Sequence, residues 1–334
     1  MGTFSRRKGG PLSALYAAGM SGRPLAVAAA AATLGIAVLC GSQLASGRPA
    51  APAARCPTFP KNNQWNLPVD KLPVAGDSGA LVNSIGADKP VHADFGSGTY
   101  GGGPIGIPYK NVSPHQHKVH VSFQYSDESD KGPYPIPRNV PIEGGRNSSG
   151  DRHAILVDRT HCRLYELYAL YPTGGGGWKA GSGAIWNLRS NHLRPKTWTS
   201  ADAAGLPIFP GLARWAEARH GAIHHALRFT VPETRKAFIY PARHQAGDTN
   251  DPNVPAMGQR FRLKASFDIS GFPKQSRIVL TALKNYGMIV ADNGSSWFIS
   301  GAPSPGWNND DLHQLGRVTG RDFEAVDTSS LPKG

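Results

Sequence analysis

Cysteine is scarce in this sequence, with three residues among 334. Cys40 lies in a segment that we expect to be removed from the mature protein. The remaining Cys56 and Cys162 predict a single disulfide, which is typical of proteins outside the cytosol. Two unrelated buried thiols are the alternative.

Long hydrophobic runs are also nearly absent, and residues 25–40 form the only one. Four basic residues and no acidic residue precede it, and small residues and proline follow from 46 to 54. This order predicts a signal peptide over residues 1–48. Because a membrane span needs roughly 20 apolar residues, the shorter run favours cleavage. We therefore expect a secreted protein. An uncleaved anchor, which would be its only link to a membrane, and a lipoprotein modified at Cys40 are the alternatives.

Acidic residues are outnumbered, with 23 Asp and Glu against 36 Lys and Arg, which gives a net charge of +13. Removal of residues 1–48 takes away five basic residues and leaves +8. A basic exported protein is attracted to anionic surfaces such as cell-wall polymers. Its basic residues are scattered, without an arginine-rich arm or a nucleic-acid-binding motif, so we expect no nucleic-acid partner.

Glycine and proline are abundant, with 40 and 28 residues, and they separate short apolar runs. This pattern predicts a mostly β protein. Residues 49–63 are a Pro/Ala linker, and residues 64–330 are expected to form a single large β-rich domain. Strand–helix alternation is not sustained and no internal repeat is visible. The predicted architecture is a two-layer, jelly-roll-like β-sandwich with two or three short helices, and a monomer is expected.

Alternation and turn residues predict strands over 119–125, 155–157, 164–171, 178–188, 225–231, 237–241, 260–265, 287–291, 297–300 and 323–326. Helices are predicted over 210–221, 275–286 and 309–315. In the strand 225–231, Leu227, Phe229 and Val231 point inward and Arg228 points outward. The strand 260–265 has one basic face, made by Arg260, Arg262 and Lys264. The turn 292–294 predicts that 297–300 is the hairpin partner of 287–291.

The sequence lacks the G-x-S-x-G, H-E-x-x-H and phosphate-loop signatures. His115 and His117 have the spacing of two metal ligands on one strand face. Residues 118–124 contain no acidic residue to complete such a site, so we expect neither a metal nor another cofactor.

Four carboxylates are the predicted catalytic residues. Glu143 and Asp130 lie in turn-rich loops, where binding and catalytic groups are common. Glu166 lies within an apolar strand, where desolvation raises a carboxyl pKa and suits a general acid. Asp202 lies among small residues that allow a ligand to approach closely. The alternatives are ordinary turn chemistry for Glu143 and Asp130, a buried pair with an arginine or an outward-facing residue for Glu166, and a helix cap for Asp202.

Four basic residues are predicted to bind substrate. His224 and Arg228 share one face of a strand, and His244 ends the predicted strand 237–241. Arg152, in the loop 150–153, completes the set. Such a cluster can hold a sugar carboxylate, although His and Arg also donate hydrogen bonds in purely structural roles.

Five stretches carry a resemblance: Asp130–Pro137, Gly150–His153, Trp198–Pro207, Tyr240–His244 and Gly287–Ser295. Together they resemble a group of exported bacterial β-rich proteins. The similarity covers most of residues 57–330. It implies an exported domain, and no activity or catalytic residue is carried over from that group.

The sequence therefore favours a secreted carbohydrate-active protein, most simply a glycoside hydrolase that acts on an extracellular or cell-wall polysaccharide with a pair of carboxylates. A non-catalytic polysaccharide-binding protein and a lyase on uronic-acid polymers are the alternatives. The binding protein would use the aromatic residues and the basic strand face. The lyase would use His224, Arg228 and His244.

Overall fold

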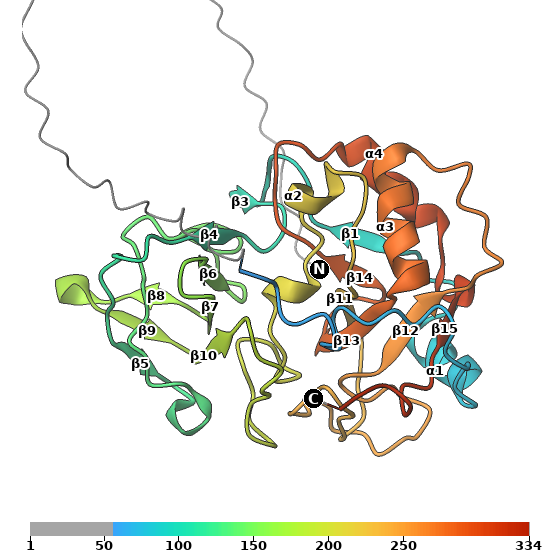
Figure 1. Cartoon of the computed structure of the whole chain (residues 1–334), viewed down its shortest axis with the longest axis horizontal. Coiled ribbons are helices and arrows are strands. Elements are labelled where there is room, and N and C mark those ends of the chain that lie inside the picture. Colours follow the sequence, from blue (N-terminus) through green and yellow to red (C-terminus); the bar gives the residue numbers. More distant parts are fainter. Residues whose placement is uncertain (1–55, 334) are drawn as a thin grey trace, which may run out of the picture. The chain divides into compact units, whose positions relative to one another are not determined.

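Residues 56–333 are described by a computed structural model of the chain (Figure 1). The predicted signal peptide, Cys40 and residues 49–55 of the predicted linker lie outside the described residues. Strands predominate over helices and form several sheets, as the sequence predicts.

The largest sheet is mixed and has six strands. In spatial order they are β1 (His92–Asp94), β14 (Phe298–Ser300), β11 (Leu227–Val231), β13 (Met288–Asn293), β12 (Arg260–Leu263) and β15 (Phe323–Ala325). β1 runs parallel to β14 and β11 parallel to β13, while the other neighbours are antiparallel. The longest helix, α3 (Lys274–Asn285), precedes β13 in the chain and contacts β12.

A four-stranded sheet has the spatial order β10 (Ser182–Asn187), β7 (Arg163–Tyr168), β6 (Ala154–Asp158) and β4 (Tyr109–Asn111). It is built from the hairpin of β6 and β7, an antiparallel strand β10 beside β7 and a parallel strand β4 beside β6. Two small sheets contain β5 (Val121–Phe123), β9 (Trp178–Ala180) and β8 (Tyr171–Pro172) in one, and β2 (Thr99–Tyr100) and β3 (Gly103–Pro104) in the other.

The remaining elements are short helices and turns. The α-helices are α1 (Ser78–Ile85), α2 (Trp215–Ala218) and α4 (Asn309–His313). The 3-10 turns are η1 (Ser126–Glu128), η2 (Gly174–Gly176), η3 (Phe209–Gly211), η4 (Gln314–Arg317) and η5 (Gly320–Asp322).

The six-stranded sheet has an apolar face and, over β1, β14, β11 and the end of β13, a polar one. Leu227, Phe229 and Val231 of β11 are fully buried in the main core, as their alternation predicts. Arg228 and Thr230 project to the opposite face. Residues paired across neighbouring strands share a face, so the register extends this surface in both directions. We call it the polar face, and it consists of His92, Asp94, Phe298, Ser300, Arg228, Thr230 and Asp292.

Three finer predictions differ from the structure. The jelly-roll arrangement is not confirmed, because parallel strand pairs occur in three of the sheets. β14 is not the hairpin partner of β13, since β11 lies between them. Residues 237–241 form no strand and make only the isolated bridge Phe238–Met257.

Arg260 and Arg262 share one face of β12 as predicted, but both are buried, so this face is not the exposed binding surface that the sequence suggested. Arg260 donates to the carbonyl oxygens of Gln64 and Leu67 at 2.6 and 2.9 Å. Arg262 donates to the carbonyl of Leu72 at 2.7 Å and pairs with Glu324 at 2.8 Å. These two arginines fasten the N-terminal segment to β12 and are not available to a polymer.

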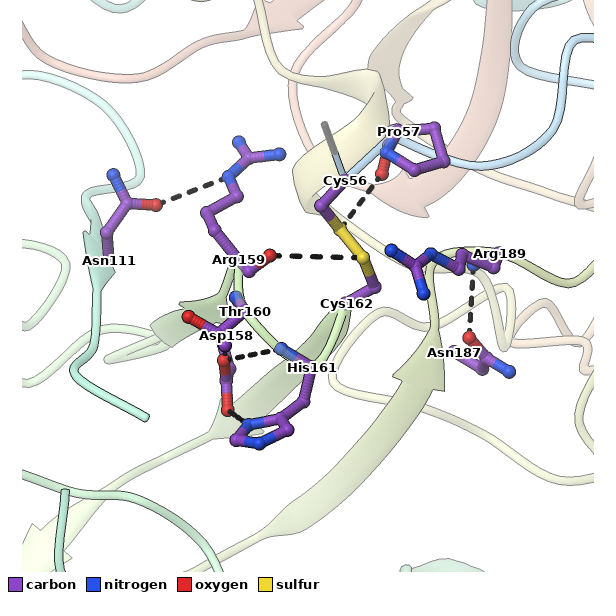
Figure 2. The surroundings of a disulfide bond; sticks show 10 residues. All are labelled: Cys56, Pro57, Asn111, Asp158, Arg159, Thr160, His161, Cys162, Asn187 and Arg189. Atoms are coloured by element: carbon purple, nitrogen blue, oxygen red, sulfur yellow. Dashed lines mark hydrogen bonds and ion pairs between the residues drawn. A yellow bond between two sulfur atoms is a disulfide. The ribbon is translucent and has the colours of Figure 1, made fainter. Parts of the chain in front are cut away.

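The predicted disulfide between Cys56 and Cys162 is confirmed (Figure 2). Cys162 is fully buried in the turn between β6 and β7. Asp158 stabilises this turn, because its carboxylate accepts from the backbone N–H groups of Thr160 and His161, each at 3.0 Å. The bond is consistent with an extracellular location. Within residues 56–333, no helix is both long and apolar enough to span a membrane.

Candidate functional site

A cavity of about 450 Å³ lies where the end of β13 meets the loops that flank β6, β7 and β10. We call it the first cavity. Its polar and aromatic lining includes Tyr125, Glu128, Asp151, His153, Tyr168, Ser182, Ser200, Asp202, His244, Asp292 and Asn293. Several acidic residues, two histidines and two tyrosines therefore line one space.

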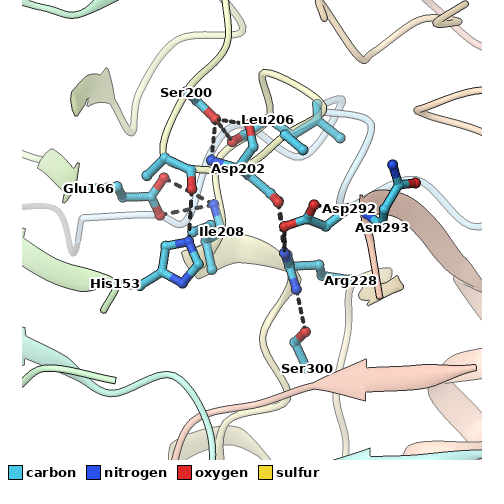
Figure 3. Close-up of polar contacts among 12 residues, drawn as sticks. His153, Glu166, Ser200, Asp202, Leu206, Ile208, Arg228, Asp292, Asn293 and Ser300 are labelled. Atoms are coloured by element: carbon cyan, nitrogen blue, oxygen red, sulfur yellow. Dashed lines mark hydrogen bonds and ion pairs between the residues drawn. The ribbon is translucent and has the colours of Figure 1, made fainter. Parts of the chain in front are cut away.

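Arg228 links two acidic residues of this cavity, Asp202 and Asp292, to Ser300 (Figure 3). Its guanidinium donates two hydrogen bonds to Asp202, at 2.8 and 2.9 Å, and one to Asp292 at 3.0 Å. It also donates to the Ser300 hydroxyl at 2.6 Å. Burial alone would lower the pKa of Arg228, but Asp202 outweighs it and raises the pKa above its ordinary value. Arg228 is therefore a permanent buried cation.

Asp202 is held by a tight turn that follows β10. Its backbone N–H donates to the Ser200 hydroxyl at 2.9 Å, and its carbonyl accepts from the N–H of Gly205 at 3.0 Å. Gly205 has a φ of 67°, which a residue with a side chain adopts only with strain. The turn places a fully buried carboxylate against Arg228. The alternative of a simple helix cap is not what the structure shows.

Asp292 lies at the end of β13 and differs from Asp202 in exposure. Its side chain keeps 24% of its surface exposed, whereas that of Asp202 keeps 0%. Burial raises the pKa of Asp292 to about 6, against the opposing effect of Arg228. The nearby charges of Asp202 and Asp151 raise it further. A carboxyl group in this state can exchange a proton with a ligand near neutral pH.

His153 forms a buried ion pair with Glu143. Its Nδ1 lies 2.6 Å from Glu143 Oε2, and its Nε2 lies 2.9 Å from the carbonyl oxygen of Ala201. Burial lowers the pKa of His153, but the Glu143 carboxylate more than compensates and the pKa rises to about 9. His153 in turn lowers the pKa of Glu143 against the effect of burial. The pair is therefore an imidazolium and a carboxylate at neutral pH.

Glu143, Asp151 and His153 are close enough to suggest a metal site, since one ligand atom from each lies within 4.8 Å of the others. However, both ring nitrogens of His153 face acceptor oxygens, which fits a protonated ring that donates twice. A protonated imidazole has no lone pair for a cation. We therefore interpret this cluster as an ion pair beside an acid.

The loop that carries Asp151 is fixed by Arg152. This buried guanidinium donates to the carbonyls of Arg146 and Ser148 at 2.7 and 2.9 Å, and to that of Leu170 at 3.1 Å. The Asp151 side chain is exposed and lines the first cavity. Arg152, predicted to bind substrate, thus positions its neighbour instead of facing the cavity.

Glu166 is fully buried and is not among the residues that line the first cavity. Its carboxylate accepts from the backbone N–H groups of Ile208 at 3.0 Å and Phe209 at 2.8 Å, and from the Trp186 indole at 3.2 Å. Desolvation raises its pKa to about 7, against these donors. The expected raised pKa is present, but the group connects β7 to the segment 206–209 instead of facing a ligand.

Asp130 also has a structural environment. It pairs with Arg194 at 2.7 Å and accepts from the backbone N–H of Ile185 at 2.8 Å. Glu143 does not line the first cavity either, although its partner His153 does. Of the four predicted catalytic carboxylates, only Asp202 lines this space, and Arg228 occupies both of its oxygens.

The predicted basic cluster is divided. His244 lines the first cavity, and its Nδ1 lies 2.8 Å from the carbonyl oxygen of Ala203. Arg228 does not line the cavity but bonds Asp202 and Asp292, which do. His224 is exposed, lies at the edge of the Tyr286 ring with 6.4 Å between centroids, and does not line the cavity.

The sequence reasoning missed Asp292, and it singled out the loop 150–153 without selecting Asp151 or His153. Asp292 was interpreted as a turn residue after the strand 287–291. The available signal was its position: it lies near the carboxyl end of a buried strand, and ligands often bind beyond such ends in sheets with parallel strands. No family model matches the chain, and no curated protein and no solved structure matches it either.

Proposed function

We propose that this chain is a secreted glycoside hydrolase that acts on an uncharged polysaccharide, with Asp292 as the general acid and Asp151 as its partner. The observation that carries the proposal is the state of Asp292, a partly exposed carboxyl in a cavity with a pKa raised to about 6. A general acid works best when its pKa is near the working pH.

The environments of the two carboxyl groups suit different roles. Asp151 is exposed and its charge acts on Asp292. In a hydrolase, one carboxyl protonates the glycosidic oxygen as the bond to the anomeric carbon breaks, and the second takes the proton of the attacking water. Asp292 supplies the first proton, and Asp151 accepts the second.

The aromatic residues of the cavity support a sugar ligand. Tyr125 is 46% exposed and lines the first cavity together with Tyr168. A phenol ring offers an apolar face to the C–H groups of a sugar and a hydroxyl to its oxygens. The predicted signal peptide and the disulfide, which is consistent with an extracellular location, support an activity outside the cell, where polysaccharides occur.

Charge favours hydrolysis of a neutral polymer over elimination from a uronic-acid polymer. Four carboxylates line the first cavity, at Glu128, Asp151, Asp202 and Asp292. The two buried cations there, Arg228 and His153, are already paired with carboxylates. Arg228 pairs with Asp202 and Asp292, and His153 pairs with Glu143. A uronate would therefore meet a net negative lining.

The test is incubation of the mature chain with neutral and acidic polysaccharides. We expect new reducing ends from at least one neutral polymer, and kcat/KM that falls as pH rises through about 6, because Asp292 must be protonated. Asp292→Asn should lower the rate by roughly 10²–10⁴-fold. The matched control is Asp70→Asn, an exposed aspartate outside the cavity lining.

Three results would contradict the proposal. Unsaturated uronides, seen by their ultraviolet absorbance, would show a lyase. Binding to a polymer without any new reducing ends would show a binding protein. Full activity in Asp292→Asn would show that another group is the acid.

A further inference from the structure

A second cavity, of about 640 Å³, lies at the other end of the polar face. Residues of β1 and β14 form part of its lining, namely His92, Asp94 and Phe298. Tyr100, from the β2–β3 hairpin, and Glu143 also line it. Nothing in the proposed catalytic mechanism uses this space.

The two cavities share their dividing wall. Glu143 lines the second cavity and its ion-pair partner His153, 2.6 Å away, lines the first. Along the sheet, Asp94 pairs in register with Ser300, and Ser300 accepts from Arg228, which in turn holds Asp292. The linings of the two cavities are therefore connected through the ion pair His153–Glu143 and through Arg228 with its partners.

The second cavity combines aromatic rings with hydrogen-bond acceptors. Tyr100 is 84% exposed, more than any other large hydrophobic residue among residues 56–333. His92 and Phe298 stack with 4.2 Å between ring centroids. Asp94 and Glu143 offer carboxylate oxygens. Apolar ring faces beside acceptors complement a sugar, which has C–H faces and hydroxyl donors.

The acidic groups of the second cavity also favour a ligand that carries no negative charge. Glu143 is ionised because His153 lowers its pKa. Burial raises the pKa of Asp94, with a further contribution from Glu143. A carboxylated sugar would be repelled here, as it would be in the first cavity, while the hydroxyls of a neutral sugar donate to these oxygens.

We propose that the second cavity is a saccharide subsite, and that one uncharged oligosaccharide spans both cavities with Tyr100 as a stacking platform. This inference rests on the proposed function for the identity of the first site. It extends that function by assigning an oligosaccharide, longer than the two sugars at the cleaved bond, as the preferred ligand.

The test measures binding separately from cleavage. Hexasaccharides of β-1,4-linked glucose, xylose and mannose and of β-1,3-linked glucose are titrated into the full mature chain carrying Asp292→Asn, by calorimetry. We expect one hexasaccharide per chain. In the same background, Tyr100→Ala should weaken binding by roughly tenfold, the loss expected for one aromatic contact. Tyr100→Phe keeps the ring and should bind within about twofold of the parent. Thermal unfolding of each variant verifies that the chain is folded.

The outcomes separate the two proposals. Equal affinity of the Tyr100→Ala and Tyr100→Phe chains overturns the subsite even if hydrolysis is observed. Two independent hexasaccharides per chain overturn the spanning arrangement, and no binding to any of the four overturns the subsite. Tight, Tyr100-dependent binding without cleavage by the wild-type chain supports the subsite while the hydrolase proposal fails.

Discussion

At the scale of a single residue, burial raises the pKa of Glu166 as the sequence predicts, but the carboxylate has a structural role. Replacement of its carboxylate by an amide in Glu166→Gln would place an N–H₂ group against the N–H donors of Ile208, Phe209 or Trp186. A buried donor that faces donors costs about 1–3 kcal/mol. We expect the free energy of unfolding, measured with urea, to fall by this amount.

The activity of the same variant distinguishes this role from catalysis. Because Glu166 does not line the first cavity, Glu166→Gln should keep a hydrolysis rate near that of the wild type once folded. A variant of unchanged stability with a hundredfold slower rate would instead support the acid role that the sequence suggested.

His153 predicts a specific dependence of stability on pH. Its pKa in the folded chain is raised from 6.5 to about 9, so the folded state binds the proton more tightly than the unfolded chain. The resulting stabilisation is complete below pH 6.5 and is lost as pH rises toward about 9. We expect urea unfolding between these pH values to show this loss.

Variants assign the effect to one histidine. His153→Gln should remove most of the pH dependence in this range, as well as lowering stability by leaving Glu143 unpaired. His224→Gln, at an exposed histidine, should leave the dependence unchanged. The same pH dependence in the wild type and in His153→Gln would contradict the assigned ion pair.

At the scale of the element, alternation correctly predicted the inward face of β11 but not that Arg228, on its other face, is also buried. Leu227, Phe229 and Val231 are buried as expected. Arg228 is buried too, because Asp202, 26 residues earlier in the chain, covers it. Periodicity identifies which residues share a face, whereas the partner that packs on that face depends on tertiary contacts.

The dependence on tertiary contacts also explains why the sequence identified only part of the candidate site. Asp202, Arg228 and His244 were selected from local patterns, and the structure brings them to one region. The proposed pair, Asp151 and Asp292, joins a loop before β6 to the end of β13. Nothing in either segment alone indicates the other, since their proximity follows from how the sheets are assembled.

The bounds of helix α3 were predicted to within one residue. The residue that caps its N-terminus, however, lies in another helix and was not predicted. The helix has Pro273 at its N-cap position, no side-chain cap and no acid in its first turn. Asp311 of α4 supplies the missing acceptors, because its oxygens accept from the N–H groups of Gln275 and Ser276 at 2.9 and 2.8 Å.

Removal of this cap should weaken the helix end measurably. We expect Asp311→Ala to lower the free energy of unfolding by about 1–2 kcal/mol, as for other caps, with an added loss of charge at the helix N-terminus. Asp310→Ala, at the exposed neighbour, should cost only a few tenths of a kcal/mol. Equal effects of the two variants in urea unfolding would show that the cap contributes nothing.

At the scale of the whole molecule, the net charge is a weaker guide than the sequence suggested. Arg194, Arg228 and Arg262 are buried in ion pairs, and Arg260 is buried against backbone carbonyls. Much of the arginine content therefore holds segments together. Attraction to anionic polymers depends on the exposed lysines and arginines that remain, while acidic residues line both cavities.

The disulfide joins positions separated by 106 residues, so it constrains a large part of the unfolded chain. A loop of about 100 residues corresponds to roughly 4–5 kcal/mol in the chain-entropy model, and measured losses are about 2–5 kcal/mol. We expect the double variant Cys56→Ser with Cys162→Ser to be less stable by this amount in urea unfolding.

The double variant should still fold and retain hydrolysis and hexasaccharide binding, because Arg260 and Arg262 fasten residues 64–72 independently of the cysteines. Reduction of the wild-type chain is the matched control and should reproduce the stability of the variant, since both remove the same constraint. Equal stability of oxidised and reduced wild type would mean that these arginines alone fix the N-terminal segment, and that the disulfide adds no constraint that the folded chain needs.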